Sequence, residues 1–224
     1  MEGTRLDILL ILQRSPYSTV EDITSQLDLA PATVRRHLDI LQRDRMVAYV
    51  ALKNKVGRPE HAFYLTETGQ ETLPKDYGRL LALLLEELGK LSPGAASDFS
   101  GKDALELALR RVSEREWAER ARTMGGGQVE ERLKALATLL SERGFRPVVE
   151  REGDAIRFRL LNCPFRTAAL VSDLVCSFDR HLLTSVLGQE VIKEDCIRSG
   201  DPGCCYRTLQ PLALPGQAPP YPLP

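Results

Sequence analysis

The chain has 224 residues, 43% of them hydrophobic and 27% charged, and a formal net charge of −1. This composition is typical of an ordinary globular protein with one large or two modest domains. The near-zero charge excludes a protein that binds polyanions over its whole surface, although it leaves room for a local basic face. The apolar run from Ile8 to Leu12 is far shorter than the ~20 residues that span a bilayer. With no secretory signal pattern either, we expect a cytoplasmic protein without a membrane partner.

Five elements are expected in the first part of the chain. They are helices at 5–14, 18–27 and 31–44 and strands at 46–52 and 61–66. Ser18 is the expected N-cap of the second helix, and Pro31 suits the first position of the third. A turn rich in Gly, Pro and basic residues joins the strands. This is the element order of a winged helix-turn-helix, which we predict as a DNA-binding domain over residues 1–74.

The third helix has the two faces that a recognition helix needs. Val34, Leu38 and Leu41 share an apolar face, while the opposite face is polar and basic. Between residues 31 and 60, seven Lys and Arg outweigh three Asp and Glu, a local charge of +4. Such a charge would attract phosphates. The predicted DNA-binding residues are Thr33, Arg35, Arg36 and Arg43 on the helix and Lys53, Lys55 and Arg58 on the wing.

Two residues near this face have distinct expected roles. Arg58 stands between a glycine and a proline at the wing tip, a position suited to a narrow minor groove. His37 is expected to pack half-buried rather than to contact phosphate. The alternative for the whole segment is a solvated basic helix beside a structural hairpin, which the combined pattern disfavours.

The rest of the chain predicts a helix, a linker and a second domain. Residues 76–91 form a helix with leucines on more than one face, so we expect it to pack against a second copy of the chain. We assign residues 75–100 to this dimerisation helix and its linker, 101–210 to an α+β sensor domain and 211–224 to a disordered Pro-rich tail. The sensor domain is expected to contain helices at 102–123, 128–143 and 168–187 and strands at 146–151, 155–161, 190–196 and 204–209. The predicted fold class is therefore α+β.

All five cysteines lie in the second domain, between residues 163 and 205. An odd, clustered set does not fit an extracellular disulfide framework. The spacing matches neither a zinc ribbon nor a ferredoxin run, so by itself it predicts a metal site only weakly. Cys163 and Cys204 follow turn-forming residues, from which thiolates can converge on one group. Cysteines can instead be small buried hydrophobes, and Cys176, in an apolar helical stretch, is the strongest case for that alternative.

The sequence resembles the SufR group, the iron–sulfur-cluster-binding repressors of the Suf cluster-assembly operon. The segments VRRHLDIL, GRPEHAFYLTETG, LPKDYGRL, NCPF and GDPGC carry the resemblance, which extends over residues 5–209. The spacing of the family's three cluster cysteines matches Cys163, Cys176 and Cys204. Cys196 and Cys205 are additional to that pattern, and each could be a fourth ligand, a resolving thiol or inert.

The resemblance implies a homodimeric transcriptional repressor that binds a double-stranded DNA operator when an iron–sulfur cluster is present, with a [4Fe–4S] cluster favoured. When the cluster is lost, the repressor would release the operator, and the cluster-assembly genes that it controls would be expressed. One alternative is a zinc-responsive or thiol-redox regulator with the same DNA-binding half. A second is an iron–sulfur enzyme or electron carrier whose N-terminal domain docks a partner.

We do not expect an enzyme. The sequence lacks the nucleophile-elbow, zinc-protease and phosphate-loop motifs. Its three histidines give little general acid–base machinery, and His181, alone on the predicted 168–187 helix, is expected to be structural rather than a metal ligand.

Overall fold

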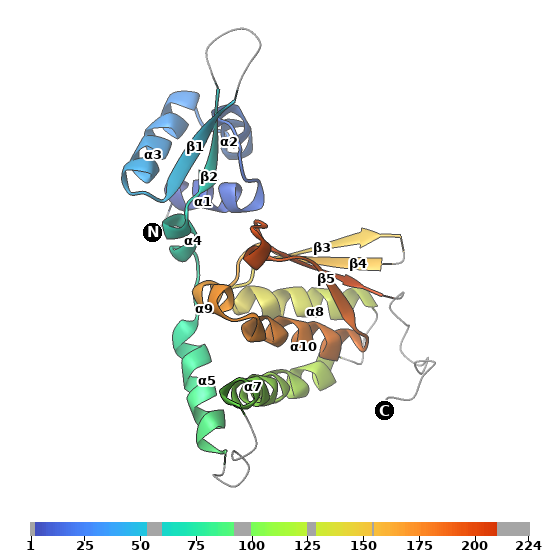
Figure 1. Cartoon of the computed structure of the whole chain (residues 1–224). Helices are drawn as coiled ribbons and strands as arrows, with labels where there is room; N and C mark the ends of the chain where they lie inside the picture. Colours follow the sequence, from blue (N-terminus) through green and yellow to red (C-terminus); the bar gives the residue numbers. More distant parts are fainter. Residues whose placement is uncertain (1–2, 53–59, 92–99, 125–128, 154, 210–224) are drawn as a thin grey trace. The chain divides into compact units, whose positions relative to one another are not determined.

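The structure is a computed structural model (Figure 1) that describes residues 3–52, 60–91, 100–124, 129–153 and 155–209, with side chains for all of these except 116–124 and 129. The chain divides into two compact units. Unit 1 is Met1–Pro74 and unit 2 is Lys75–Pro224. The predicted tail 211–224 lies outside the described residues. None of the described helices is long and apolar enough to cross a bilayer.

Unit 1 contains a bundle of three helices and a hairpin. Its elements are α1 (Thr4–Arg14), α2 (Val20–Leu27), α3 (Pro31–Arg43), β1 (Val47–Leu52), β2 (Glu60–Leu65) and α4 (Glu67–Glu71). β1 and β2 pair antiparallel from Val47 opposite Leu65 to Leu52 opposite Glu60. The apolar faces of the three helices and the hairpin bury one core, and the predicted inner face of α3 contributes Val34, Leu38 and Leu41 to it.

Two local features of unit 1 differ from the sequence analysis. The N-cap of α2 is Thr19 rather than Ser18, and it forms a capping box with Asp22. Ser18 is buried instead, and its backbone oxygen accepts a hydrogen bond from the Phe63 amide of β2. The short helix α4, capped by Thr66, was not predicted because one turn has no apolar period to detect.

Unit 2 packs helices against one antiparallel sheet. Its elements are α5 (Tyr77–Gly89), α7 (Gly101–Met124), α8 (Val129–Glu142), β3 (Pro147–Glu152), β4 (Ala155–Leu160), α9 (Arg166–Val171), η1 (Asp173–Val175), α10 (Cys176–Leu187), β5 (Val191–Asp195), η2 (Ile197–Ser199) and β6 (Cys204–Thr208). The strand order is β3-β4-β6-β5. α8 and α10 contact the sheet, α7 packs on α10, and α5 packs on α7 (Figure 1). The α+β fold class with its N-terminal winged helix-turn-helix is confirmed.

The predicted helix at 168–187 is wrong as a single element. Ser172 is extended, with φ −135° and ψ 127°, and it separates α9 from the 3-10 turn η1 that leads into α10. The sequence hid this break because the residues on both sides are apolar. Its consequence is that Cys176 stands at the first turn of α10 instead of in the middle of a helix.

Candidate functional site

The outer face of α3 carries the predicted DNA-reading side chains. Thr33, Arg35, Arg36 and Arg43 are all exposed, while Val34 between them is fully buried. His37 is half-buried, and its Nδ1 makes no hydrogen bond to a described residue. The predicted wing residues Lys53, Lys55 and Arg58 lie outside the described residues.

The hairpin adds an aromatic pair to the surface beside this helix. Tyr49 of β1 and His61 of β2 stack with ring centres 4.0 Å apart. Both line a broad hollow whose other wall is α2 and α3, including Arg35 and Gln42. Sequence analysis did not identify this pair, because their contact depends on the diagonal neighbours of the strand pairing.

The adjacent cysteines of β6, Cys204 and Cys205, lie on opposite faces of the sheet of unit 2. Successive residues of a strand point to opposite faces. On β6, Cys204 faces the same side as Tyr206, whose hydroxyl lies 3.5 Å from the Asp179 carboxylate of α10. Cys205 faces the other side, where its sulfur lies 3.9 Å from a carboxylate oxygen of Glu194 and also interacts with Arg157. The two adjacent cysteines are therefore in different environments.

Four of the five free thiols gather on the α10 side of the sheet. Cys163 interacts with Cys204 and Cys176, and Cys196 interacts with Cys204 and Cys176 in turn. All four pack on the same hydrophobic core. We call Cys163, Cys176, Cys196 and Cys204 the thiol site. The structure thus brings together the three cysteines predicted from the resemblance and adds Cys196, which spacing alone could not select.

A lysine lies among these thiols. Lys193 of β5 stands opposite Tyr206 in the strand pairing, with its ammonium 5.4 Å from the Tyr206 ring centre. It interacts with Cys176, Cys196 and Cys204. Burial acts to lower the pKa of Lys193, but Cys204, Cys176 and Cys196, as thiolates, raise it further than burial lowers it. The lysine therefore stays cationic next to sulfur atoms.

Backbone amides also point at the sulfur atoms. The amide of Phe165 donates to Cys163, that of Arg198 to Cys196 and that of Ile197 to Cys204. Hydrogen bonds of this kind stabilise thiolates and tune the redox potential of sulfur-ligated metal centres. The thiol site thus has the donors expected around bound thiolates.

Burial sets the protonation of the thiols. It raises the pKa of Cys163 and Cys176, and raises that of Cys204 to about 12. For Cys196, burial also acts upward, but the Arg198 amide and Lys193 outweigh it and lower the pKa. Burial raises the pKa of the Asp179 carboxyl to about 7, against the opposing effects of Lys193 and Tyr206. A metal centre would have to displace thiol protons, because thiolate is the ligand form.

The donors of the thiol site are of the type that iron–sulfur clusters take, because thiolates are the usual protein ligands of such clusters. Within the described residues, no group of three or more Cys, His, Asp or Glu side chains is arranged as a site for a metal ion. His181 is not among the thiols: its neighbours are Arg180, Glu114, Arg110 and Glu190.

The GDPGC segment is shaped to place two of the thiols. Gly200 has φ +93°, a conformation that favours glycine. The Asp201 carboxylate accepts a 2.8 Å hydrogen bond from the Cys196 amide. A Cβ on Gly203 would lie only 2.7 Å from the Leu160 backbone oxygen, so β6 can reach β4 at this point only with glycine there. Leu160 and Cys204 are paired directly across these strands.

The loop that carries Cys163 is bonded to the start of α5. The Asp76 amide donates to the Pro164 oxygen at 3.0 Å. The Lys75 ammonium donates to Asn162 Oδ1 at 3.3 Å, and the Thr167 amide donates to the Tyr77 hydroxyl at 3.0 Å. Lys75 is also the first residue after unit 1. The Cys163 loop therefore fixes the segment through which the chain leaves the DNA-binding domain.

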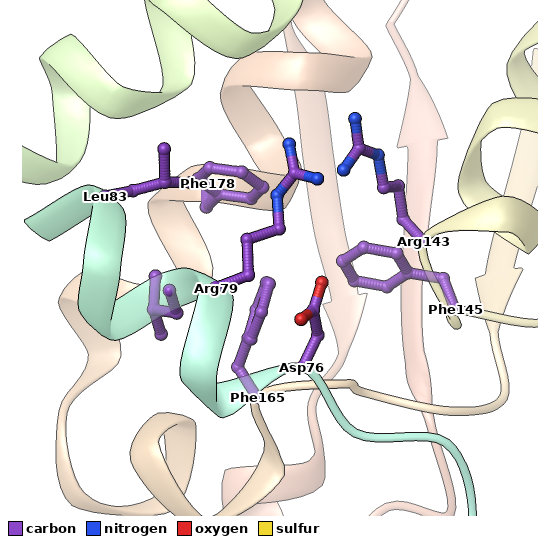
Figure 2. A pocket seen from close by; sticks show the side chains of 8 residues that line it. Asp76, Arg79, Leu83, Arg143, Phe145, Phe165 and Phe178 are labelled. Atoms are coloured by element: carbon purple, nitrogen blue, oxygen red, sulfur yellow. The ribbon is translucent and has the colours of Figure 1, made fainter.

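Aromatic packing reinforces this connection. Phe165 packs edge-on against Phe145 and Phe178, with ring centres 6.0 and 5.7 Å apart. Figure 2 shows these rings around a small pocket that Arg79 and Leu83 of α5 also line. Phe165 follows Cys163 by two residues, and Phe178 follows Cys176 by two. A displacement of either cysteine would thus move an aromatic ring of this pocket, next to α5.

Comparison with known proteins agrees with the geometry of unit 1. Residues 2–49 match a family model described as bacterial regulatory protein, arsR family. Unit 1 is a winged helix-turn-helix. The description of the matched family is that of regulatory proteins. No curated protein matches the chain. A crystal structure of Bacillus subtilis PadR in complex with operator DNA has 14% identity, covers 79% of this chain and 90% of that chain, and has a TM-score of 0.29.

The close approach at Gly203 gives a direct test of the site's architecture. Gly203→Ala should force β6 away from Leu160, lower the stability by about 1–3 kcal/mol and displace Cys204. Gly78→Ala is the control, because a Cβ there meets nothing within 4 Å. Thermal unfolding of both variants measures the effect. Equal unfolding midpoints for Gly203→Ala and wild type would contradict this account of the loop.

Proposed function

We propose that the protein is a homodimeric transcriptional repressor that senses an iron–sulfur cluster and controls cluster-assembly genes. The observation that carries the proposal is the gathering of Cys163, Cys176 and Cys204 in a unit whose first residues continue a winged helix-turn-helix. The resemblance of the sequence to the SufR group supports the same function. The favoured cluster is [4Fe–4S].

DNA contact falls to the exposed residues of unit 1. The N-terminal turns of α3 present Thr33, Arg35 and Arg36, as a recognition helix presents side chains to base edges. Arg43 lies in the last turn, suited to phosphate. Lys53, Lys55 and Arg58 are assigned to the wing, where cations neutralise phosphate and Arg58 enters the minor groove.

A bound cluster would hold several thiolate side chains in one fixed arrangement. Cys163, Cys176 and Cys204 would hold it, and Lys193 would compensate part of the negative charge of the Cys176 and Cys204 sulfurs. Ordering the Cys163 loop keeps Asn162, Pro164 and Thr167 in place as partners of the start of α5. Regulation then depends on whether α5 begins in a fixed conformation, because the chain leaves unit 1 directly before it.

The partner surface for a second copy is on α5. One side of this helix packs on the core of unit 2 through Leu80, Leu83 and Leu84. Another side exposes Leu81, Leu85 and Leu88, a stripe with the spacing of one helix face, and the first two are 57% and 60% exposed. A two-fold axis along this stripe would bury it in both copies. The operator is then an inverted repeat with half-sites about 34 Å, or a multiple of it, apart.

The decisive test compares operator binding by anaerobic cluster-loaded, metal-free and zinc-loaded protein at one salt concentration. Typical allosteric couplings of ~1–3 kcal/mol predict that loaded protein binds ~5–150-fold more tightly than metal-free protein. Cys163→Ser, Cys176→Ser and Cys204→Ser should each behave like metal-free protein. Equal affinities of loaded and metal-free protein would refute cluster sensing, and recovery with zinc alone would identify a zinc regulator.

Arg36 tests the recognition helix. Arg36→Ala should reduce discrimination between operator and unrelated DNA by about 1–3 kcal/mol, because a bidentate base contact is lost. Arg14→Ala, also an exposed arginine but at the end of α1, is the matched control. Fluorescence anisotropy titrations at two salt concentrations separate base from phosphate contacts. Unchanged discrimination in Arg36→Ala would remove α3 from the base-reading role.

The dimer is tested on the exposed leucines. Leu85→Glu should give a monomer at micromolar concentration, because a charge would be buried at the two-fold axis. Ile192→Glu changes an exposed apolar residue on β5 and should leave the dimer intact. Light scattering of both variants gives the masses. A wild-type monomer with full operator affinity would end the proposal of a dimer.

A further inference from the structure

We propose that Cys196 is the fourth thiolate ligand of the cluster, so that the site is a four-cysteine site with Cys205 outside it. This inference rests on the proposed function and adds a ligand that neither the family spacing nor any comparison assigns. The inference depends on the positions of Cys196 and Cys205 in the folded chain, because the spacing of the cysteines in the sequence does not distinguish the two.

The loop after β5 fixes Cys196 relative to Cys204. Cys196 begins the turn η2, whose Ser199 amide donates to the Cys196 oxygen at 2.8 Å. The Asp201 carboxylate accepts from the Cys196 amide at 2.8 Å, and the Asp201 amide lies 3.4 Å from the Cys196 oxygen. The GDPGC segment is thus hydrogen-bonded to Cys196 through Asp201, and the same segment ends with Cys204. The two thiols are held by one small, internally bonded loop.

The sulfur of Cys196 already belongs to the thiol site. It interacts with the thiol of Cys204 and with that of Cys176, from a different element. The Arg198 amide donates to Cys196, two residues on, just as the Phe165 amide donates to Cys163. Cys196 therefore has the same type of backbone donor as a cysteine that the resemblance marks as a ligand.

Cys205 has a different set of neighbours. It lies on the opposite face of β6 and interacts with Arg157 and Glu194. Glu194 is in turn bonded to Arg207 and Arg157, which makes a charged network on that face. Rotating Cys205 into the thiol site would require β6 to slip by one residue, and Gly203 against Leu160 prevents this.

The position of Lys193 places Cys196 in the same electrostatic environment as two of the other thiols. Buried negative charge is costly unless a cation compensates it. Lys193 interacts with Cys176, Cys196 and Cys204 and also lies over the Tyr206 ring. A lysine in this position would stabilise negatively charged sulfur ligands, and Cys196 is one of the thiols that it contacts.

Thiol footprinting of the full-length wild-type protein is the first arm of the test. The anaerobic cluster-loaded and metal-free forms are each treated with iodoacetamide, and the labelled cysteines are identified by mass spectrometry. In the metal-free form we expect Cys196 to be labelled fastest, because it is only half-buried and its pKa is lowered, and we expect loading to protect it. Buried Cys205 should be labelled slowly and equally in both forms. Equal labelling of Cys196 in the two forms of a protein that holds iron and sulfide would overturn the proposal.

The second arm compares Cys196→Ser with Cys205→Ser, a matched pair in the same segment. Cys196→Ser should shorten the half-life of the cluster in air on the order of tenfold, because a hydroxyl is a poorer iron ligand than a thiolate. Cys205→Ser should match wild type in iron, sulfide and half-life. Circular dichroism of the metal-free variants separates misfolding from lost ligation. Equal half-lives of the two variants would assign the fourth position to another group.

The two arms separate failure of the ligand from failure of the function. If wild-type protein reconstituted with iron and sulfide holds neither, the proposed cluster is wrong and this inference falls with it. If wild-type protein holds both but Cys196 behaves as Cys205 does, the function stands and only the fourth ligand is wrong.

Discussion

The burial of sulfur around one lysine is the constraint on which unit 2 depends. Cys204 and Tyr206 point from β6 toward α10, and Lys193 meets them from β5. Without a ligand, burial raises the pKa of Cys163, Cys176 and Cys204, so these groups are neutral thiols. In the proposed function, where thiolates would hold a cluster, Lys193 and the backbone amides would supply compensating positive charge. The same residues would thus accommodate both states of the proposed sensor.

The site is connected to the DNA-binding unit through the chain itself. The residues around Cys163 bond to Lys75, Asp76 and Tyr77, which directly follow unit 1. Phe165 adds packing that reaches the first turns of α5 (Figure 2). α5 also carries the exposed leucine stripe, so in the proposed dimer one helix would contact both the Cys163 loop and the second copy of the chain.

The sequence predicted the features that have a local cause. The buried face of α3 and the hairpin followed from helical and alternating periods, which the core of unit 1 requires. It missed features that depend on contacts between distant segments. The break at Ser172 lies in an apolar stretch that looks continuous. The backbone of Ser18 forms a bridge with Phe63 of β2, so α2 begins one residue later, with Thr19 as its N-cap. Cys196 and Cys205 could not be distinguished until the pairing of β6 gave each a face.

The strength of the connection at α5 is of the size that regulation needs. Three hydrogen bonds join the Cys163 loop to residues 75–77, and a bond of this kind contributes about 0.5–1.5 kcal/mol net. Losing two of them when the loop loosens would change the free energy of the start of α5 by ~1–3 kcal/mol, the usual size of an allosteric coupling. A dimer would contain this connection twice on one operator. Under the proposed function, local loosening of one cysteine loop would therefore suffice to shift the population that fits DNA, without a large rearrangement of unit 2.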